Sequence, residues 1–293
     1  MNVSRRYAML LVGSALAVPG CAKNAGAIRI GSKNFTESVI VAEIYAQALE
    51  RAAIPVLRKF ELGSTQIALA ALVRGDIDLY PEYTGTGLID VLHHAPLRDE
   101  RAIYKIVQNE FEHRFDVQWL APSPMNDSQG LATTRALAER YGLRTLSDLS
   151  AKAPQLRLAT IPEFVSRADG LPGLQHFYGG FQFKDVKTYE IGLKYQALLT
   201  GAADVATAFT TDGQIAADRL VVLDDDRQMW PPYHVAPIVR RQLLTARPHV
   251  AALLDRIGSF ITTEAAQTMN AAVDVDKHDP GDVASEFVKA HPE

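Results

Sequence analysis

From residue 28 onward, short strand-like segments alternate with helix-like segments, and this alternation constrains the fold more than any other feature. Residues 27–32 (AIRIGS) have the two-residue hydrophobic period of a strand. Residues 65–74 have a helical period and precede Gly75, a residue type that commonly ends helices in the left-handed conformation. Further strand-like segments lie at residues 55–62, 77–80, 117–120, 156–160 and 185–189. The pattern predicts an α/β fold with largely parallel sheets and helices on both faces.

A helix start is predicted after the first strand. Asn34 is followed three residues later by Glu37, and side chains at this spacing can satisfy the free N–H groups of a first helical turn. Ile40, Ile44 and Ala48 then share one face of the expected helix.

One segment of the chain is echoed later in the sequence. Residues 71–84 align without gaps onto residues 197–210, at an offset of 126. The matched pairs are Gly75 with Gly201, Asp78 with Asp204, Tyr83 with Phe209, and Thr84 with Thr210. Helix–glycine–strand units look alike in any α/β protein, which is one explanation. The other is two similar lobes, whose equivalent strands would present an aromatic residue to a shared cleft at their carboxyl ends.

Two breaks in the alternation predict where the chain crosses between lobes. They lie at residues 122–127 and 230–233, both rich in proline. We expect one lobe of residues 28–125 plus 230–293 and a second lobe of residues 126–229. Two connecting segments would form the hinge of a bilobal protein that closes around a ligand.

Residues 1–21 are predicted to be a signal peptide. Arg5 and Arg6 precede an apolar stretch, residues 7–18, that is too short for a typical spanning helix. Cys21, the only cysteine, resembles the lipid-acceptor site of a bacterial lipoprotein; the alternative is an ordinary residue just past a conventional cleavage site. Export by the general or the twin-arginine route stays open.

The location and partners follow from export and from charge. We expect the protein in the periplasm or at the outer face of the cytoplasmic membrane, held there only through a lipid anchor. Apolar residues make up 47% of the chain and charged residues 22%, which is typical of a globular protein. A net charge of −4 without long basic blocks argues against a nucleic-acid partner.

Three aromatic residues follow strands rather than lying inside an apolar pattern. Tyr83, Phe209 and Tyr233 lie in segments rich in proline, threonine and glycine. Aromatic faces that converge suit a soft cation such as a quaternary ammonium group, and each face contributes about 0.5–2 kcal/mol. These residues therefore indicate a site for an organic cation.

Six stretches, in this order and spacing, resemble one group of proteins: IRIGSKNFTE, DIDLYPEYTGTG, EFVSRADGLPGL, GLKYQALLTG, TTDGQI and PPYHVAP. The group is the substrate-binding proteins of ABC transporters for glycine betaine, choline and related osmoprotectants. The resemblance covers nearly the whole chain from residue 28. It implies a type II periplasmic-binding-protein fold, with two α/β lobes, a two-segment hinge and the ligand in the cleft. It also implies a monomer that delivers its ligand to an ABC permease and its ATPase, without a cofactor.

The resemblance assigns residues to the two ends of a ligand. An aromatic cage would surround the cationic head, while an arginine fork and a lysine point charge would hold a carboxylate. The assigned residues are Tyr83, Tyr233 and Phe209 at the cation, Lys33, Thr86 and Arg167 at the anionic end, and Gln129, Asn34 and Thr65 as further ligand-binding candidates.

Two positions depart from the family pattern. Gln129 stands where a cage tyrosine is usual, and Phe209 stands where the family usually has tyrosine. These differences imply either weaker betaine binding or a different ligand with a cationic head and an anionic end. Larger betaines, carnitine-like compounds and ergothioneine-like compounds are the alternatives.

An enzyme and a sensory module are the competing interpretations. The sequence has no G-x-S-x-G motif, phosphate loop or cysteine nucleophile, and His93-His94 has no evident third metal ligand, so we expect neither catalysis nor a metal site. Sensory modules are usually fused to a signalling segment, whereas this sequence ends soon after its last helix, which favours a transport receptor. Tyr80 is expected in the core, and Glu82 is expected to stabilise its loop.

Overall fold

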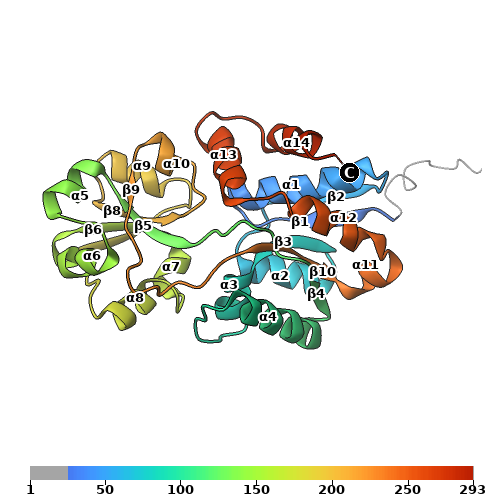
Figure 1. Ribbon diagram of the computed structural model, residues 1–293, viewed down its shortest axis with the longest axis horizontal. Helices are drawn as coiled ribbons and strands as arrows, with labels where there is room; N and C mark the ends of the chain where they lie inside the picture. Colours follow the sequence, from blue (N-terminus) through green and yellow to red (C-terminus); the bar gives the residue numbers. More distant parts are fainter. Residues whose placement is uncertain (1–25, 293) are drawn as a thin grey trace, which may run out of the picture.

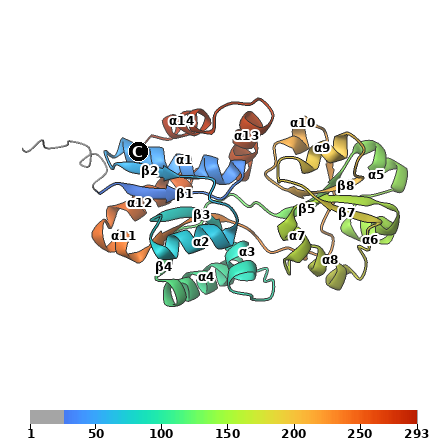
Figure 2. The ribbon, with the colours of Figure 1, turned by 180° about the vertical axis from the view of Figure 1, so that it is seen from behind.

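Two lobes, each built around a five-stranded sheet, make up the elongated molecule (Figures 1 and 2). The computed structural model describes residues 26–292, so the predicted signal peptide and Cys21 lie outside the described residues. The strand order is β2-β1-β3-β10-β4 in lobe 1 and β7-β6-β8-β5-β9 in lobe 2. None of the described helices is both long and apolar enough to cross a bilayer.

Lobe 1 contains both ends of the described chain. Its strands are β1 (Ile28–Gly31), β2 (Val56–Lys59), β3 (Leu79–Tyr83), β4 (Val117–Trp119) and β10 (Val235–Arg240). Its helices are α1 (Thr36–Arg51), α2 (Thr65–Arg74), α3 (Thr84–Thr86) with the π-helical turn Gly87–Val91, α4 (Glu100–Phe115), α11 (Arg241–Ala246), α12 (His249–Gly258), α13 (Thr263–Asp274) and α14 (Pro280–Ala290).

Lobe 2 is formed by one continuous part of the chain. Its strands are β5 (Gln129–Thr133), β6 (Arg157–Thr160), β7 (Asp185–Thr188), β8 (Val205–Phe209) and β9 (Val221–Val222). Its helices are α5 (Arg135–Tyr141), α6 (Leu146–Lys152) with the 3₁₀ turn Ala153–Gln155, α7 (Pro162–Ser166), α8 (Leu171–Tyr178), α9 (Lys194–Leu199) and α10 (Gln214–Ala217).

The sheets are largely parallel, as predicted, but one strand in each is reversed. β10 runs antiparallel to β3 and β4, and β5 runs antiparallel to β8 and β9. Both β5 and β10 are the first strands after the chain crosses between lobes. They start at the cleft and run into their lobe, whereas β3 and β8 run toward the cleft.

The two crossing segments, residues 120–128 and 223–234, lie side by side. An isolated antiparallel bridge joins Asn126 to His234. The side-chain oxygen of Asn126 accepts the Tyr233 N–H at 2.7 Å, and the Asp127 N–H donates to the Tyr233 carbonyl at 3.1 Å. This contact couples the two segments at the point where a hinge would bend.

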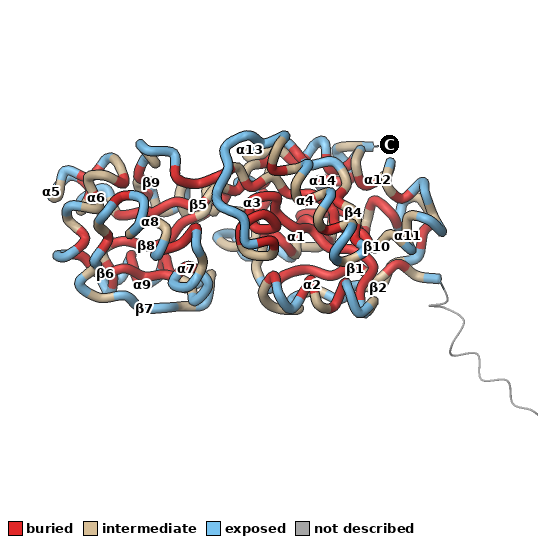
Figure 3. Tube along the Cα trace, turned by 90° about the horizontal axis from the view of Figure 1, so that it is seen from below, coloured by how far each residue is buried: buried red, intermediate tan, exposed pale blue. Residues whose placement is uncertain are grey.

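Helix α1 begins later than predicted. Its N-cap is Phe35, without a side-chain capping bond, so the prediction that Asn34 starts the helix was wrong. Glu37 turns into the interior, toward Tyr83 and Asn270, instead of back to the helix start. The remainder of α1 is largely buried because it packs between the lobe 1 sheet and the helices α12 and α14 (Figure 3).

An arginine–aspartate clamp explains the first half of the internal echo. The Arg29 guanidinium donates to both carboxylate oxygens of Asp78, at 2.9 and 2.6 Å. It also donates to the carbonyl of Gly75, which ends α2 in the left-handed conformation at a φ of 79°. The clamp ties the first strand of lobe 1 to the segment between α2 and β3.

Lobe 2 repeats this clamp, with the glycine and the aspartate that the alignment pairs and with Arg157 in place of Arg29. The Arg157 guanidinium donates to both oxygens of Asp204 at 2.8 Å and to the carbonyl of Gly201 at 2.9 Å. In both lobes the arginine lies on a strand parallel to the one that carries the cleft aromatic residue. The echo therefore reflects two similarly built lobes.

The clamp predicts a stability difference between two neighbouring aspartates. Asp78→Ala should lower the free energy of unfolding by about 1–3 kcal/mol, because the half-buried Arg29 loses charge-assisted hydrogen bonds. Asp76→Ala is the control: its ion pair with Arg74 is exposed, and a change below about 0.5 kcal/mol is expected. Urea unfolding measures both, and equal effects would contradict the assignment.

Candidate ligand-binding cleft

A cavity of about 570 Å³ lies between the lobes, where the carboxyl ends of β3 and β8 meet the starts of β5 and β10. All nine residues that the sequence assigned to ligand binding line this cavity. They are Lys33, Asn34, Thr65, Tyr83, Thr86, Gln129, Arg167, Phe209 and Tyr233. The fold therefore brings together residues that are up to 200 positions apart in the chain.

The aromatic wall is contributed by both lobes and by the second crossing segment. Tyr83 and Tyr233 are each only 3% exposed, and Phe209 is half-buried. Phe35 packs against Tyr83, with their ring centroids 6.1 Å apart. A Cβ atom at Gly85 would lie 2.5 Å from the Tyr233 ring, so the glycine permits this ring to rest against α3.

Lys33 forms a buried ion pair with Glu82, a residue expected from the sequence only to stabilise its loop. The Lys33 ammonium lies 2.6 Å from the Glu82 carboxylate and 4.5 Å from the centre of the Tyr83 ring. Glu82 also accepts the Tyr80 hydroxyl at 3.0 Å and the Tyr83 N–H at 2.8 Å. Thr65 is a further acceptor for Lys33, at 3.4 Å. Glu82 therefore fixes both a basic side chain and the aromatic wall, and the expectation that Tyr80 lies in the core is confirmed.

A second network holds the other predicted base. The Arg167 guanidinium contacts both oxygens of Asp169, at 2.8 and 2.6 Å. The Asp169 carboxylate is fully buried and also accepts the Tyr233 hydroxyl and, at 2.8 Å, the Gln129 side-chain amide. Gln129 thus supports Tyr233 at a distance of 3.0 Å instead of adding a ring of its own.

The sequence reasoning assigned no role to a third basic group, Lys194. Its ammonium is almost fully buried, 3.0 Å from Asp212, 4.5 Å from the centre of the Tyr195 ring and 5.0 Å from that of Phe209. Asp212 also accepts the Tyr195 hydroxyl at 2.6 Å and the Phe209 N–H at 3.0 Å. The signal was available, because Lys194 and Tyr195 belong to GLKYQALLTG and Asp212 belongs to TTDGQI, two of the stretches that carry the resemblance.

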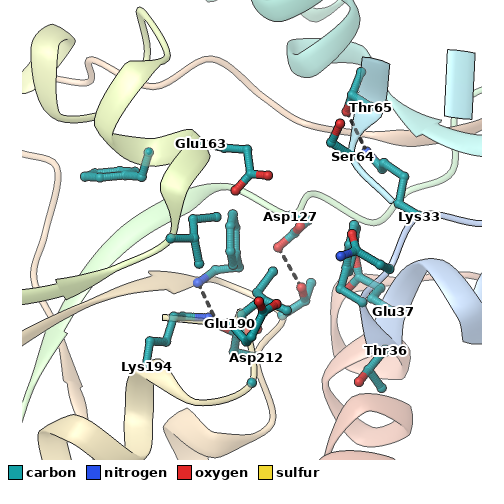
Figure 4. Close-up of a pocket in the computed structure, with 18 of the residues that line it drawn as sticks. Lys33, Thr36, Glu37, Ser64, Thr65, Asp127, Glu163, Glu190, Lys194 and Asp212 are labelled. Carbon is teal, nitrogen blue, oxygen red and sulfur yellow. Dashed lines mark hydrogen bonds and ion pairs between the residues drawn. The ribbon is translucent and has the colours of Figure 1, made fainter. Parts of the chain in front are cut away.

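Two buried carboxylates, Glu37 and Asp127, were missed entirely. Asp127 accepts the Thr211 hydroxyl at 2.6 Å, and Glu37 accepts the Tyr83 hydroxyl at 2.7 Å and the Asn270 amide at 2.9 Å. Figure 4 shows both side chains in the middle of the cavity wall, between the lobes. A signal was available for Glu37, which ends the stretch IRIGSKNFTE, whereas nothing in the local sequence distinguishes Asp127.

Burial raises the pKa of both carboxyl groups. Loss of solvation is the largest cause for Glu37, and the hydrogen bonds from Tyr83 and Asn270 oppose it. The pKa of Asp127 is raised well above its usual range, first by burial and then by the negative charge of Glu37. Buried acids whose pKa is raised in this way are typical of functional sites.

These raised values predict how stability depends on pH. An acid whose pKa is higher in the folded state binds its proton more tightly there, so stability falls as pH rises above the ordinary Glu37 value of 4.5. Glu37→Gln should abolish its share of this loss and raise the melting temperature relative to the wild type at pH 8 but not at pH 4. Glu286→Gln, on the exposed face of α14, is the control. If the melting temperatures of the wild type and Glu37→Gln change with pH in the same way between pH 4 and pH 8, the claim that burial raises the pKa of Glu37 is refuted.

Comparison with known proteins places this geometry in context. Residues 26–290 match the family described as the substrate-binding domain of the ABC-type glycine betaine transport system. A glycine-betaine-binding protein of Pseudomonas aeruginosa is 34% identical over 274 residues, which cover 90% of this chain and 88% of that relative. A Helicobacter pylori protein described as the ergothioneine transport permease/ergothioneine binding protein EgtU is 30% identical over 97% of this chain. The chain spans about half, 51%, of that relative.

A solved structure supports the same conclusion. The structure of a glycine betaine/carnitine/choline ABC transporter protein is 32% identical to this chain and superposes with a TM-score of 0.75, over 90% of this chain and 98% of the other. The predicted type II periplasmic-binding-protein fold is thereby confirmed. With a family match that extends over both lobes, the chain belongs to the family of substrate-binding domains of ABC-type glycine betaine transport systems.

Proposed function

We propose that this solute receptor of an ABC transporter binds a quaternary ammonium compound of the betaine, choline or carnitine type in the cavity between its lobes. The observation that carries the proposal is that Tyr83, Phe209 and Tyr233 all line this cavity. The names of the relatives agree with this chemistry, since they include glycine betaine, carnitine and choline.

The rings suit the cationic head for an electrostatic reason. A quaternary ammonium group is weakly hydrated and is attracted to the negative face of an aromatic ring. Within the protein, the ammonium groups of Lys33 and Lys194 already lie over the rings of Tyr83 and Phe209. These contacts support the view that the cavity wall attracts positive charge. The role predicted for Lys33, Thr86 and Arg167 at a ligand carboxylate stays a prediction, because both basic side chains already have carboxylate partners.

Capture would proceed by closure of the lobes. We infer that residues 28–125 plus 230–293 and residues 126–229 move as two units about the paired crossing segments. The division of the strands into two sheets supports this proposal. Closure would desolvate the ligand and create the surface that the permease and its ATPase recognise. Bound solute would be released unchanged, without catalysis by the receptor.

The cellular setting is part of the same proposal. We infer an exported, monomeric protein that is tethered to the outer face of the cytoplasmic membrane through a lipid on Cys21. The relationship to extracytoplasmic binding proteins supports export.

Calorimetric titration with glycine betaine, choline, carnitine and ergothioneine tests the ligand class. Ergothioneine belongs in the panel because of the relative that is described as binding it. A neutral isostere without the quaternary nitrogen should not bind.

The aromatic wall predicts a loss of affinity on truncation. Tyr83→Ala and Tyr233→Ala should each weaken binding of the quaternary ligand by about tenfold or more, since each removes a ring face and its apolar contact. Tyr141→Ala, outside the cavity lining, is the matched control and should leave affinity unchanged. Calorimetry measures all three, and unchanged affinity in both cavity variants would reject the aromatic cage.

A glycine predicts a subtler loss. In Gly85→Ala the new methyl group would overlap the Tyr233 ring and push it from its position, so affinity should fall by about tenfold while the protein stays folded. Gly258→Ala is the control, because a Cβ atom there meets open space. Wild-type affinity in Gly85→Ala would show that the position of the Tyr233 ring does not matter for binding.

A further inference from the structure

We propose that the cleft selects a quaternary ammonium ligand whose other end is uncharged over a zwitterion whose other end is a carboxylate. The inference rests on the proposed function and narrows its ligand class. It follows from the partners of the basic side chains in the cavity wall, which are carboxylates of the protein itself.

The first base is Lys33. Its carboxylate partner Glu82 is fully buried and is held by two further donors, the Tyr80 hydroxyl and the Tyr83 N–H. Removing Glu82 from Lys33 would leave a buried carboxylate with unbalanced charge, which is strongly unfavourable. A ligand carboxylate therefore cannot displace Glu82, and would add a second negative charge to a neutral pair.

The second base is Arg167, whose guanidinium is already occupied along one edge. Two of its N–H groups engage both oxygens of Asp169, which is the geometry that a ligand carboxylate would need. Asp169 is anchored in turn by Gln129 and by the Tyr233 hydroxyl. Asp169 therefore occupies the Nε/Nη2 edge of Arg167 and balances its charge.

The third base, Lys194, also has a carboxylate partner that other donors hold in place. Its partner Asp212 is held by the Tyr195 hydroxyl and the Phe209 N–H, in addition to the ammonium group. Every basic side chain among the described lining residues thus has a carboxylate partner that other donors fix in position.

Acidic side chains outnumber the basic ones on the cavity wall. Eight carboxylates and three bases line it, and only Asp212 of these carboxylates is ion-paired with a described residue. Burial raises the pKa of Glu37 and Asp127, so the negative charge of the wall comes from its more exposed carboxylates, among them Glu61, Glu163 and Glu190. Figure 4 shows Glu163 and Glu190 on the lobe 2 side of the same space. Such a wall attracts a net cation and repels a ligand carboxylate, more strongly once closure removes water.

Choline and glycine betaine test the inference, because they share the trimethylammonium head and differ at the other end. Calorimetric titration of the purified chain should give an affinity for choline that exceeds that for glycine betaine by about tenfold or more. Their ratio of dissociation constants is the readout, since errors in active protein concentration cancel in it.

Two variants test the stated cause. Asp169→Asn should free the Arg167 fork, and Glu82→Gln should free Lys33, so each should shift the ratio toward glycine betaine by about tenfold. Asp204→Asn is the matched control. It removes the partner of Arg157, an arginine–aspartate pair of the same geometry at the far end of the lobe 2 sheet, and should leave the ratio unchanged. Circular dichroism and melting curves verify that each variant is folded.

The outcomes separate this inference from the proposed function. Binding of glycine betaine equal to or tighter than that of choline overturns the inference alone. An unchanged ratio in both folded variants also overturns it. If a variant fails to fold, the ratio of the wild-type dissociation constants for glycine betaine and choline tests the inference on its own. If the folded protein shows no detectable binding of any quaternary compound, the proposed function and the inference are both overturned.

Discussion

The pairing of an outgoing and an incoming strand at the cleft places the candidate site, and the other features depend on it. In lobe 1 the end of β3 at Tyr83 pairs with the start of β10 at Val235, and in lobe 2 the end of β8 at Phe209 pairs with the start of β5 at Gln129. Each antiparallel pair brings a crossing segment next to an aromatic residue. The hinge and the binding wall are therefore parts of one structure, and movement of the hinge must move the wall.

Local sequence signals sufficed for much of this structure. The glycine that ends α2, the strand periods and the aromatic residues after strands each depend on a few neighbouring residues, so the two-lobe plan and the three aromatic residues could be predicted from them. The other six assigned residues of the cavity wall came from the family resemblance. Strand direction could not, because the reversal of β10 comes from the crossing and not from its own residues. The predicted start of α1 was wrong for a related reason. Glu37 accepts hydrogen bonds from Tyr83 and Asn270, which are distant in the sequence, and does not cap the helix.

Charge pairing was the other part that local signals could not supply. Lys33 and Glu82 are 49 residues apart, and neither residue type indicates a buried partner. As an isolated residue in the sequence, Lys33 fits an anion site, whereas in the structure its charge is balanced by the protein. The distinction matters for function, because a base with a fixed internal partner contributes position and shape but little net attraction for an anion.

The two lobes share a framework and differ where they face the ligand. The clamp formed by Arg29 and Asp78 in lobe 1 recurs in lobe 2, at the ends of the sheets away from the cleft. At the cleft, the position of Glu82 corresponds to Ala208 at the same sequence offset, and lobe 2 neutralises its lysine through Asp212 instead. Because both solutions leave the basic group paired beside an aromatic ring, similar electrostatics arise from different residues. This agreement indicates that pairing of the bases is a property of the site as a whole, so that its net negative charge comes from the exposed carboxylates of the wall, such as Glu163 and Glu190.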